Sequence, residues 1–169
     1  MDVSVAIRAR RTHKQYGSEP VDEGTLRELV DLARYAPNHH LTQPWRFRVL
    51  GRETLARLCE VAGEKEAMKL RRAPTLVLAT AVLSGEAKTD EEDLHAAAAA
   101  VYAVLLGATE RGLASYWRTP ACFDEPEIRA VLELEPRERV VGLIHLGPAV
   151  SEPPAKERAP LAEVLRILP

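Results

Sequence analysis

The sequence predicts an α+β fold in which helices wrap a small central sheet. Helical and strand patterns alternate irregularly along the 169 residues, without the repeated β-α-β units of a parallel sheet. Residues 75–82 form an apolar run without alternation, which is typical of a central strand covered on both faces. Residues 90–111 form a helical segment that is apolar on nearly every side, so several of its sides should be buried. No repeat or linker divides the chain, and we expect a single domain over residues 1–169.

The first half of the chain is expected to hold two helices, a strand and a charged helical region. The spacing of apolar residues predicts a helix over residues 3–10. Asp22 is a favourable N-cap, and the helix that it opens should end before Pro37. Residues 45–50 alternate between apolar and basic side chains, which predicts a half-buried strand. A charged helical region over residues 52–72 then leads into the apolar strand.

The second half is expected to hold shorter elements after the apolar helix. Residues 115–118 are consistent with a short strand, residues 126–132 with a helix and residues 140–146 with a buried strand. An amphipathic stretch through Leu168 closes the chain.

The apolar helix also predicts an interface between subunits. The uncharged stretch between His95 and Glu110 holds 14 residues, fewer than the roughly 20 needed to cross a bilayer. A domain of this size has little need to hide a helix on every side. We therefore expect a homodimer with Val101 and Leu105 in its seam.

Composition excludes several classes of function. A hydrophobic content of 46% with 28% charged residues is ordinary for a globular protein, and the net charge of −2 provides no basic field for nucleic acid or anionic membranes. Cys59 and Cys122 are too few and too far apart for a disulfide scaffold, so we expect both to be small hydrophobes. No Cys/His cluster has metal-ligand spacing, and residues 1–5 do not resemble a signal peptide. We expect a cytoplasmic protein without a metal site and without a nucleic-acid or membrane partner.

Four separated segments carry the functional signal. In order, they are Arg10-Arg11-Thr12-His13-Lys14-Gln15-Tyr16, the loop Ala36-Pro37-Asn38-His39-His40-Leu41-Thr42-Gln43-Pro44-Trp45-Arg46-Phe47, Gly112-Leu113-Ala114-Ser115-Tyr116-Trp117-Arg118-Thr119, and Val141 to Gly147 joined to Lys156-Glu157-Arg158-Ala159-Pro160-Leu161. The first resembles the Arg-Arg-Ser element of the nitroreductase family, and the second its Ala-Pro-Ser loop ending in Gln-Pro-Trp. The third resembles the turn that passes the flavin ring in compact bacterial members. Together, in this order, they cover nearly the whole chain.

The resemblance implies a nitroreductase-like fold, an interwoven homodimer and two FMN sites at the subunit interface. Arg10, Lys156 and Arg158 match the positions that hold the phosphate, and Arg is well suited to grip a phosphate with paired hydrogen bonds. Arg11 and Thr12 match positions along the ribityl chain and ring edge. Lys14 matches a position near the pyrimidine edge, where a cation stabilises the negative charge of reduced flavin. Taken alone, this basic cluster would more simply be a solvated helix end.

The remaining candidate residues also follow from the resemblance. Asn38 and His39 match residues that one subunit extends over the flavin of its neighbour, and the adjacent histidines lack a third ligand for a metal. The backbone around Trp117, Arg118 and Thr119 should reach flavin N5 and O4, although Trp117 is also compatible with a core position. Tyr35 could pack against the cofactor, but an ordinary core tyrosine is equally consistent with its position. His95 and His145 have no evident partners and are expected to be structural.

The implied activity is an FMN-dependent oxidoreductase that takes hydride from NAD(P)H. It would reduce nitroaromatic, quinone or similar electron-poor compounds by a ping-pong mechanism, with chemistry at flavin N5 and no essential acid or base side chain. Leu41 where many members have Asn, and Arg118 near the position of a Glu in larger relatives, leave the substrate open. A specialised flavin dehydrogenase or dehalogenase, or a non-enzymatic FMN carrier, remains an alternative.

Overall fold

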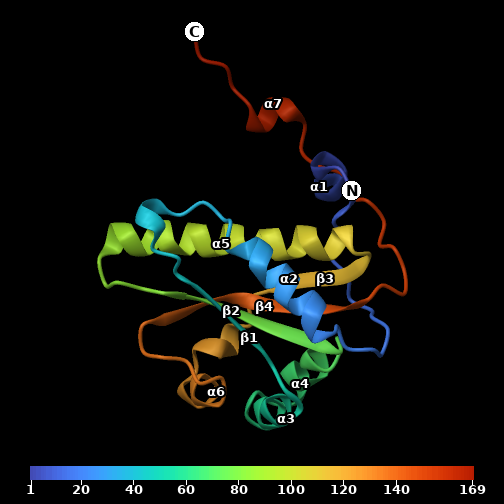
Figure 1. Ribbon diagram of the computed structural model, residues 1–169, viewed down its shortest axis with the longest axis vertical. Helices are drawn as coiled ribbons and strands as arrows, with labels where there is room; N and C mark the ends of the chain where they lie inside the picture. Colours follow the sequence, from blue (N-terminus) through green and yellow to red (C-terminus); the bar gives the residue numbers. More distant parts are fainter.

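The computed structural model describes residues 1–169 as a four-stranded antiparallel sheet with helices on both faces (Figure 1). The strand order is β1-β2-β4-β3, so β1 and β3 form the two edges. The strands are β1 (Trp45–Val49), β2 (Thr75–Val82), β3 (Leu113–Arg118) and β4 (Glu138–Pro148). This architecture confirms the predicted α+β class and all four predicted strands to within two residues at each end.

The helices form two layers. On one face lie α2 (Glu23–Ala33) and α5 (Ala87–Glu110), and on the other lie α3 (Arg52–Val61), α4 (Glu64–Leu70) and α6 (Pro126–Val131). Asp22 caps α2 as expected, accepting a hydrogen bond from the backbone N–H of Thr25. The predicted charged helical region over residues 52–72 consists of two helices, which Gly63 separates with a positive φ of 75°.

Each face of the sheet has its own hydrophobic core. Val77, Ala79 and Ala81 of β2 point towards α2 and α5, whereas Leu76 and Leu78 point towards α3, α4 and α6. The expectation that this strand is covered on both faces is therefore confirmed. The cysteines, both free, lie in or against the second core, as the composition predicted.

The helix α5 is buried on one side only within a single chain. Val101 and Leu105 are buried in the core between α5 and the sheet, so the expectation that they lie in a subunit seam is wrong. They face the chain's own sheet because helical periodicity places them on the same side as Ala97 and Ala108. The outward side carries a partly exposed stripe of His95, Ala98, Ala99, Tyr102, Ala103 and Leu106.

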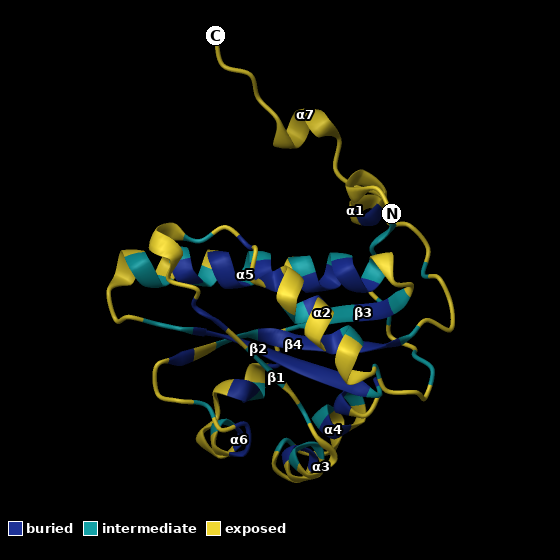
Figure 2. Ribbon diagram, in the orientation of Figure 1, coloured by how far each residue is buried: buried dark blue, intermediate teal, exposed yellow.

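The two ends of the chain lie outside the two cores. Figure 2 shows α1 (Val3–Ala9) and the C-terminal tail largely exposed, with buried residues gathered in the sheet and the helix sides that face it. The amphipathic end of the chain forms only one short helix, α7 (Leu161–Val164), and its apolar side chains are exposed. A single chain therefore provides no partner for this apolar surface.

Trp117 of β3 lies directly over Gly142 of the neighbouring strand β4, which has no side chain to obstruct the indole. Its indole Nε1 donates to the carbonyl of Val141 at 3.1 Å, and a Cβ placed on Gly142 would lie 2.0 Å from that nitrogen. The side chain packs against the core under α5. The close approach of the Trp117 indole to the β4 backbone therefore requires a glycine at position 142.

We predict that Gly142→Ala lowers the free energy of unfolding by about 1–3 kcal/mol, because the added methyl group overpacks the Trp117 contact. Urea denaturation followed by circular dichroism measures the change. In a Trp117→Leu background the same substitution should cost less, since the main steric partner has been removed. An equal cost in both backgrounds would show that Trp117 is not the obstacle.

Candidate functional site

A small cavity of about 240 Å³ lies beside the edge strand β3. Segments far apart in the sequence build its wall: the chain after α1, the end of α4, and strands β3 and β4. Its lining is mostly basic and aromatic: Lys14, Tyr16, Lys69, Arg72, Tyr116, Arg118 and His145. Two of these, Lys14 and Arg118, belong to the set predicted from the sequence.

The segment that follows α1 reaches the cavity by pairing with the edge of β3 at His13 and with the end of β4 at Tyr16 and Gly17. The backbone N–H of His13 donates to the carbonyl of Ser115 at 3.0 Å, and Gly17 donates to Pro148 at 2.9 Å. The hydroxyl of Tyr16 donates to the carbonyl of His13 at 2.8 Å, which fixes the turn between them. These bonds hold Lys14 and Tyr16 at the cavity.

An ion-pair network connects β3 with α4 across the cavity wall. Glu66 contacts the guanidinium of Arg118 and also accepts from Lys69 at 3.1 Å. Arg118 Nη1 is buried and has no hydrogen-bond partner. Lys14 and Arg72 add two more positive charges to the lining, so four cations line the cavity and only two of them pair with the Glu66 carboxylate. This excess of positive charge suits an anion or an electronegative ring.

The aromatic lining supplies neutral polar groups. His145 is 1% exposed, and its ring centre lies 5.7 Å from that of Tyr116. Burial, reinforced by the nearby cations Arg118 and Arg72, lowers the pKa of His145 to about 4. Burial also raises the pKa of Tyr16. At neutral pH the cavity therefore combines cations with uncharged donors.

The residues before Lys14 extend this surface along the edge of β3. Arg10 is the C-cap of α1, and Arg11 donates to the carbonyls of Arg8 and Arg10. Arg11 Nε is buried without a partner, whereas Thr12 is exposed. Arg11 lines a separate hollow beside Thr109 and Leu113, so of these predicted residues only Lys14 reaches the cavity itself.

The backbone of β3 offers hydrogen-bonding groups along the same edge. Ser115 directs both its N–H and its C=O at His13. In an antiparallel ladder residues two apart point their backbone groups the same way. The backbone groups of Trp117 therefore face the open edge, while Arg118 points its side chain into the cavity and Thr119 is exposed just beyond the strand.

The loop with Asn38 and His39 lies at the opposite end of α5. His39 Nδ1 is 2.7 Å from Glu92, and Thr42 donates to Asp93 at 2.6 Å. Glu92 and Glu110 near the two ends of α5 are 18 residues apart, or roughly 27 Å at 1.5 Å per residue. Figure 1 shows the loop over the N-terminal end of α5 and β3 beside its C-terminal end. The loop does not reach the cavity of its own chain.

The loop itself is closely constrained. The side chain of Asn38 accepts from the backbone N–H of Gln43 at 2.9 Å and donates to the carbonyl of Ala36. His40, Leu41 and Gln43 all have positive φ, a conformation that costs free energy for residues other than glycine. Tyr35, just before the loop, has 80% of its surface exposed.

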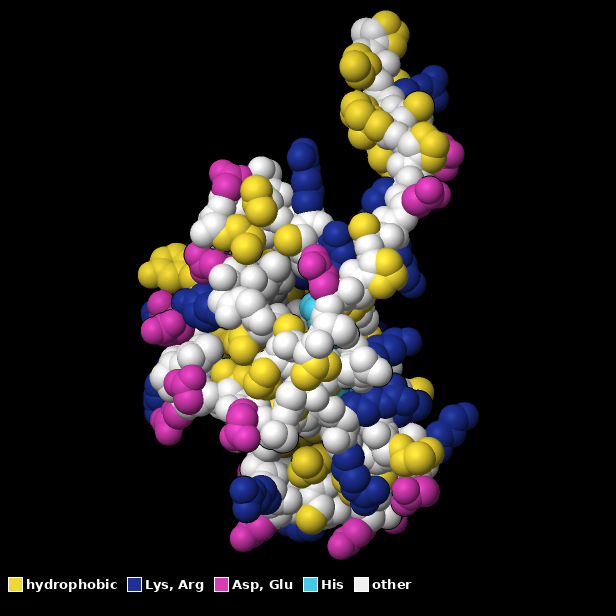
Figure 3. All heavy atoms as spheres, turned by 90° about the vertical axis from the view of Figure 1, so that its right-hand side faces the viewer, with side chains coloured by type: hydrophobic (Ala, Val, Ile, Leu, Met, Phe, Trp, Pro, Cys, Tyr) yellow, Lys and Arg dark blue, Asp and Glu magenta, His cyan; other side chains and the backbone are white.

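The tail residues Lys156 and Arg158 are also separate from the cavity. Both are exposed, and Arg158 donates only to the carbonyls of Lys156 and Glu157. Figure 3 shows the tail projecting from the domain as an arm with hydrophobic side chains along it. The predicted phosphate site is therefore not assembled within a single chain.

Five cavity residues were not among the predicted site residues: Tyr16, Lys69, Arg72, Tyr116 and His145. The alternation of β3 would have placed Tyr116 on the same face as Arg118. His145 was expected to be structural, and its position opposite Tyr116 depends on the strand register. Lys69 and Arg72 reach the cavity only because α4 packs under the sheet.

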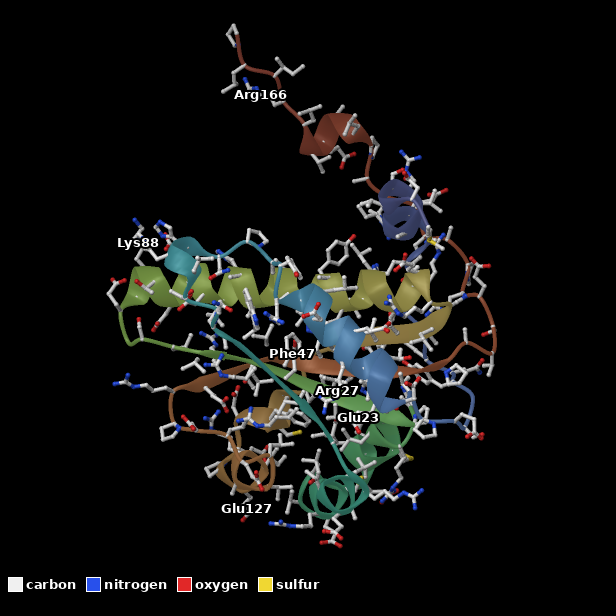
Figure 4. All side chains as sticks on the ribbon, viewed as in Figure 1. Glu23, Arg27, Phe47, Lys88, Glu127 and Arg166 are labelled. Atoms are coloured by element: carbon white, nitrogen blue, oxygen red, sulfur yellow. The ribbon has the colours of Figure 1, made fainter.

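A larger open hollow of about 1110 Å³ lies between α2 and the edge strand β1. Figure 4 shows Glu23, Arg27 and Phe47 at this surface. Glu23 and Arg27 pair with each other at 2.6 Å, so the rim presents less unpaired charge than the smaller cavity. No group of three or more His, Cys, Asp or Glu residues is placed to hold a metal ion, and no helix is long and apolar enough to cross a membrane.

Comparisons with known proteins agree with this fold. The family model "Nitroreductase family" matches residues 7–69 and 61–148. YfhC of Bacillus subtilis (strain 168), named as a candidate NAD(P)H nitroreductase, is 24% identical over 173 residues, covering 93% of this chain and 89% of YfhC.

Solved structures show the same similarity. A nitroreductase-like family protein from Bacillus cereus superposes with a TM-score of 0.88 at 23% identity, over 99% of this chain and 96% of that one. A candidate nitroreductase from Desulfovibrio desulfuricans in complex with FMN gives a TM-score of 0.83 at 26% identity, with the same coverage. Since the family model spans most of the sequence and the fold agrees with it, the chain belongs to the nitroreductase family.

Proposed function

We propose that the protein is an FMN-dependent oxidoreductase that takes hydride from NAD(P)H and reduces small electron-poor compounds such as nitroaromatics or quinones. The observation that carries the proposal is the cation-lined cavity at the open edge of β3. Family membership, the FMN bound to the Desulfovibrio protein and the NAD(P)H in the name of YfhC support it.

The donor set of the cavity fits a flavin ring. The pyrimidine edge of FMN carries carbonyl acceptors and becomes negatively charged on reduction. Arg118 Nη1 and the His145 ring are buried polar groups without partners, so they call for a ligand that hydrogen-bonds. Lys14, Lys69 and Arg72 provide the positive charge that such an edge favours. When bound, FMN would supply the two-electron chemistry between the nicotinamide donor and the oxidant.

The protein's own residues would bind and orient the cofactor. Arg11 and Thr12 would line the ribityl chain, and the outward backbone of Trp117 would meet the central part of the ring. Arg10 would hold the phosphate together with Lys156 and Arg158 once the C-terminal tail packs in the assembled dimer. We assign no side chain as an essential acid or base, and solvent supplies protons.

We also propose that the functional unit is a homodimer that completes each site. Asn38 and His39 lie over the N-terminal end of α5 and do not line the cavity of their own chain. Two-fold pairing of antiparallel α5 helices would bring this loop, with Tyr35 before it, to the neighbour's cavity. The outward apolar stripe of α5 provides a surface for that pairing.

The exposed tail supports an interwoven assembly. Its apolar side chains, Leu161, Val164, Leu165, Ile167 and Leu168, are between 53% and 87% exposed. An apolar arm of this kind is covered when it lies across a second copy. Packing of the tail across a second copy would also move Lys156 and Arg158 out of their present solvent-exposed positions.

Anaerobic stopped-flow mixing with NADH and NADPH tests the activity. We expect rapid bleaching of the flavin absorbance with at least one nucleotide, followed by recovery when a nitroarene or quinone is added. Double-reciprocal plots of the steady-state rate against nucleotide concentration, at several fixed concentrations of the oxidant, should be parallel, as a ping-pong mechanism requires. Bound FMN that neither nucleotide reduces would indicate a flavin carrier instead.

A second prediction concerns the cofactor and its phosphate. The purified protein should be yellow and release FMN, not FAD, on denaturation, as mass spectrometry would show. Arg158→Ala should weaken FMN binding by about 1.5–3 kcal/mol, the range for hydrogen bonds to charged groups. Arg166→Ala, in the same tail, is the matched control and should leave the affinity unchanged. Equal losses in both variants would show that Arg158 has no specific role.

A third prediction concerns assembly. Tyr102→Glu places a charge in the outward stripe of α5 at an exposed position that belongs to neither core, so it should dissociate the dimer and reduce FMN retention together. Light scattering and flavin absorbance on the same column peak measure both. Arg57→Glu, an exposed change on α3, should affect neither. A monomer that keeps stoichiometric FMN would contradict the shared-site proposal.

A further inference from the structure

His145 is an unusual residue for its position in β4. Its neighbours Ile144 and Leu146 are fully buried in one core and Leu143 in the other, so this stretch of the strand is otherwise apolar. His145 is 1% exposed, yet it lines the cavity, and neither ring nitrogen has a hydrogen-bond partner in the protein. A buried polar group in this state costs free energy that a leucine would not.

The groups around His145 do not provide that partner. Arg118 and Arg72 are cations and cannot accept a hydrogen bond, while Glu66 is engaged by Arg118 and Lys69. Tyr16 uses its hydroxyl hydrogen on the carbonyl of His13. Tyr116 faces His145 as a tilted ring pair, with centroids 5.7 Å apart. The remaining neighbour is the cavity, so the partner of the imidazole would be whatever fills it.

We propose that His145 is a positioning residue for the flavin, hydrogen-bonding the pyrimidine edge of the ring where it enters the cavity; this inference rests on the proposed function. A neutral imidazole both donates and accepts, which matches an edge of two carbonyls and one N–H. Burial, together with the nearby cations, keeps His145 uncharged, so it recognises the edge by its hydrogen-bond pattern while Lys14, Lys69 and Arg72 provide the charge. His145 thus lowers the stability of the FMN-free protein and raises its affinity for FMN.

His145→Leu separates this role from a structural one, because the two forms of the protein should respond in opposite directions. Without FMN, the variant should unfold at a higher temperature than the wild type, by about 3 °C or more, since the unpaired polar group is gone. Titration with FMN, followed by flavin fluorescence, should give a dissociation constant raised about two- to tenfold. Thermal unfolding is followed by circular dichroism of the full-length protein.

Thr80→Val is the matched control. Thr80 is fully buried in β2, away from the cavity, and hydrogen-bonds Glu138 at 3.3 Å. This substitution should lower the unfolding temperature and leave FMN affinity unchanged. That result would show that a loss of core stability does not by itself weaken FMN binding.

The outcomes distinguish the two proposals. If wild-type protein binds no FMN, the proposed function fails. If wild type and His145→Leu bind FMN equally, the proposed function stands and the role of His145 is overturned. If His145→Leu is less stable than wild type without FMN, or does not fold, the imidazole stabilises the fold itself and the inference is also overturned.

Discussion

The pairing of β3 with β4 is the constraint on which the functional surface depends. One register places Tyr116 opposite His145 and Arg118 opposite Leu143, so that three polar side chains from an edge strand and its neighbour face the same side. The other edge of β3 stays open, and the segment after α1 occupies only part of it. A single strand therefore provides a side-chain cavity on one face and backbone hydrogen-bonding groups along its edge. A shift of one residue would turn Tyr116 and Arg118 into the core under α5.

The position of α5 determines how much of a site a single chain can form. This helix of 24 residues lies on one face of the sheet with the Asn38–Gln43 loop over its N-terminal end, whereas the cavity opens on the other face, where α4 packs. Glu92 and Asp93 anchor the loop, and three residues with positive φ fix its shape. This rigid loop lines no part of its own chain's cavity. The rigid conformation of the loop is consistent with the proposed dimer, in which it would reach the cavity of a second copy packed against the outward stripe of α5.

The cavity shows how a ligand site weakens the fold that carries it. Arg118 is paired through one nitrogen with Glu66, but its other terminal nitrogen is buried and unpaired, as are both nitrogens of His145. Each such group costs free energy in a packed interior. Apolar residues of similar volume would give a more stable domain without a binding surface. Stability and binding are thus opposed at this strand, as is common where function requires buried polar groups.

The sequence by itself determined the elements and the family, because both depend on local patterns. A continuous apolar run without alternation predicted the strand Thr75–Val82 with the observed bounds, Asp22 marked the start of α2, and four ordered motifs indicated the nitroreductase family. The sequence placed Lys14 and Arg118 among the site residues for the same reason, since each lies inside a motif.

Only the tertiary structure decided which residues share a surface. Lys69, Arg72 and His145 carry no local signal, and they meet because α4 packs beneath β4 and the strand register sets His145 against Tyr116. The structure also turned Val101 and Leu105 towards the chain's own sheet, leaving Ala98 and Tyr102 outward. An apolar residue looks the same in sequence whichever core it enters. Its direction is fixed by packing between elements distant in the chain, which no local pattern records.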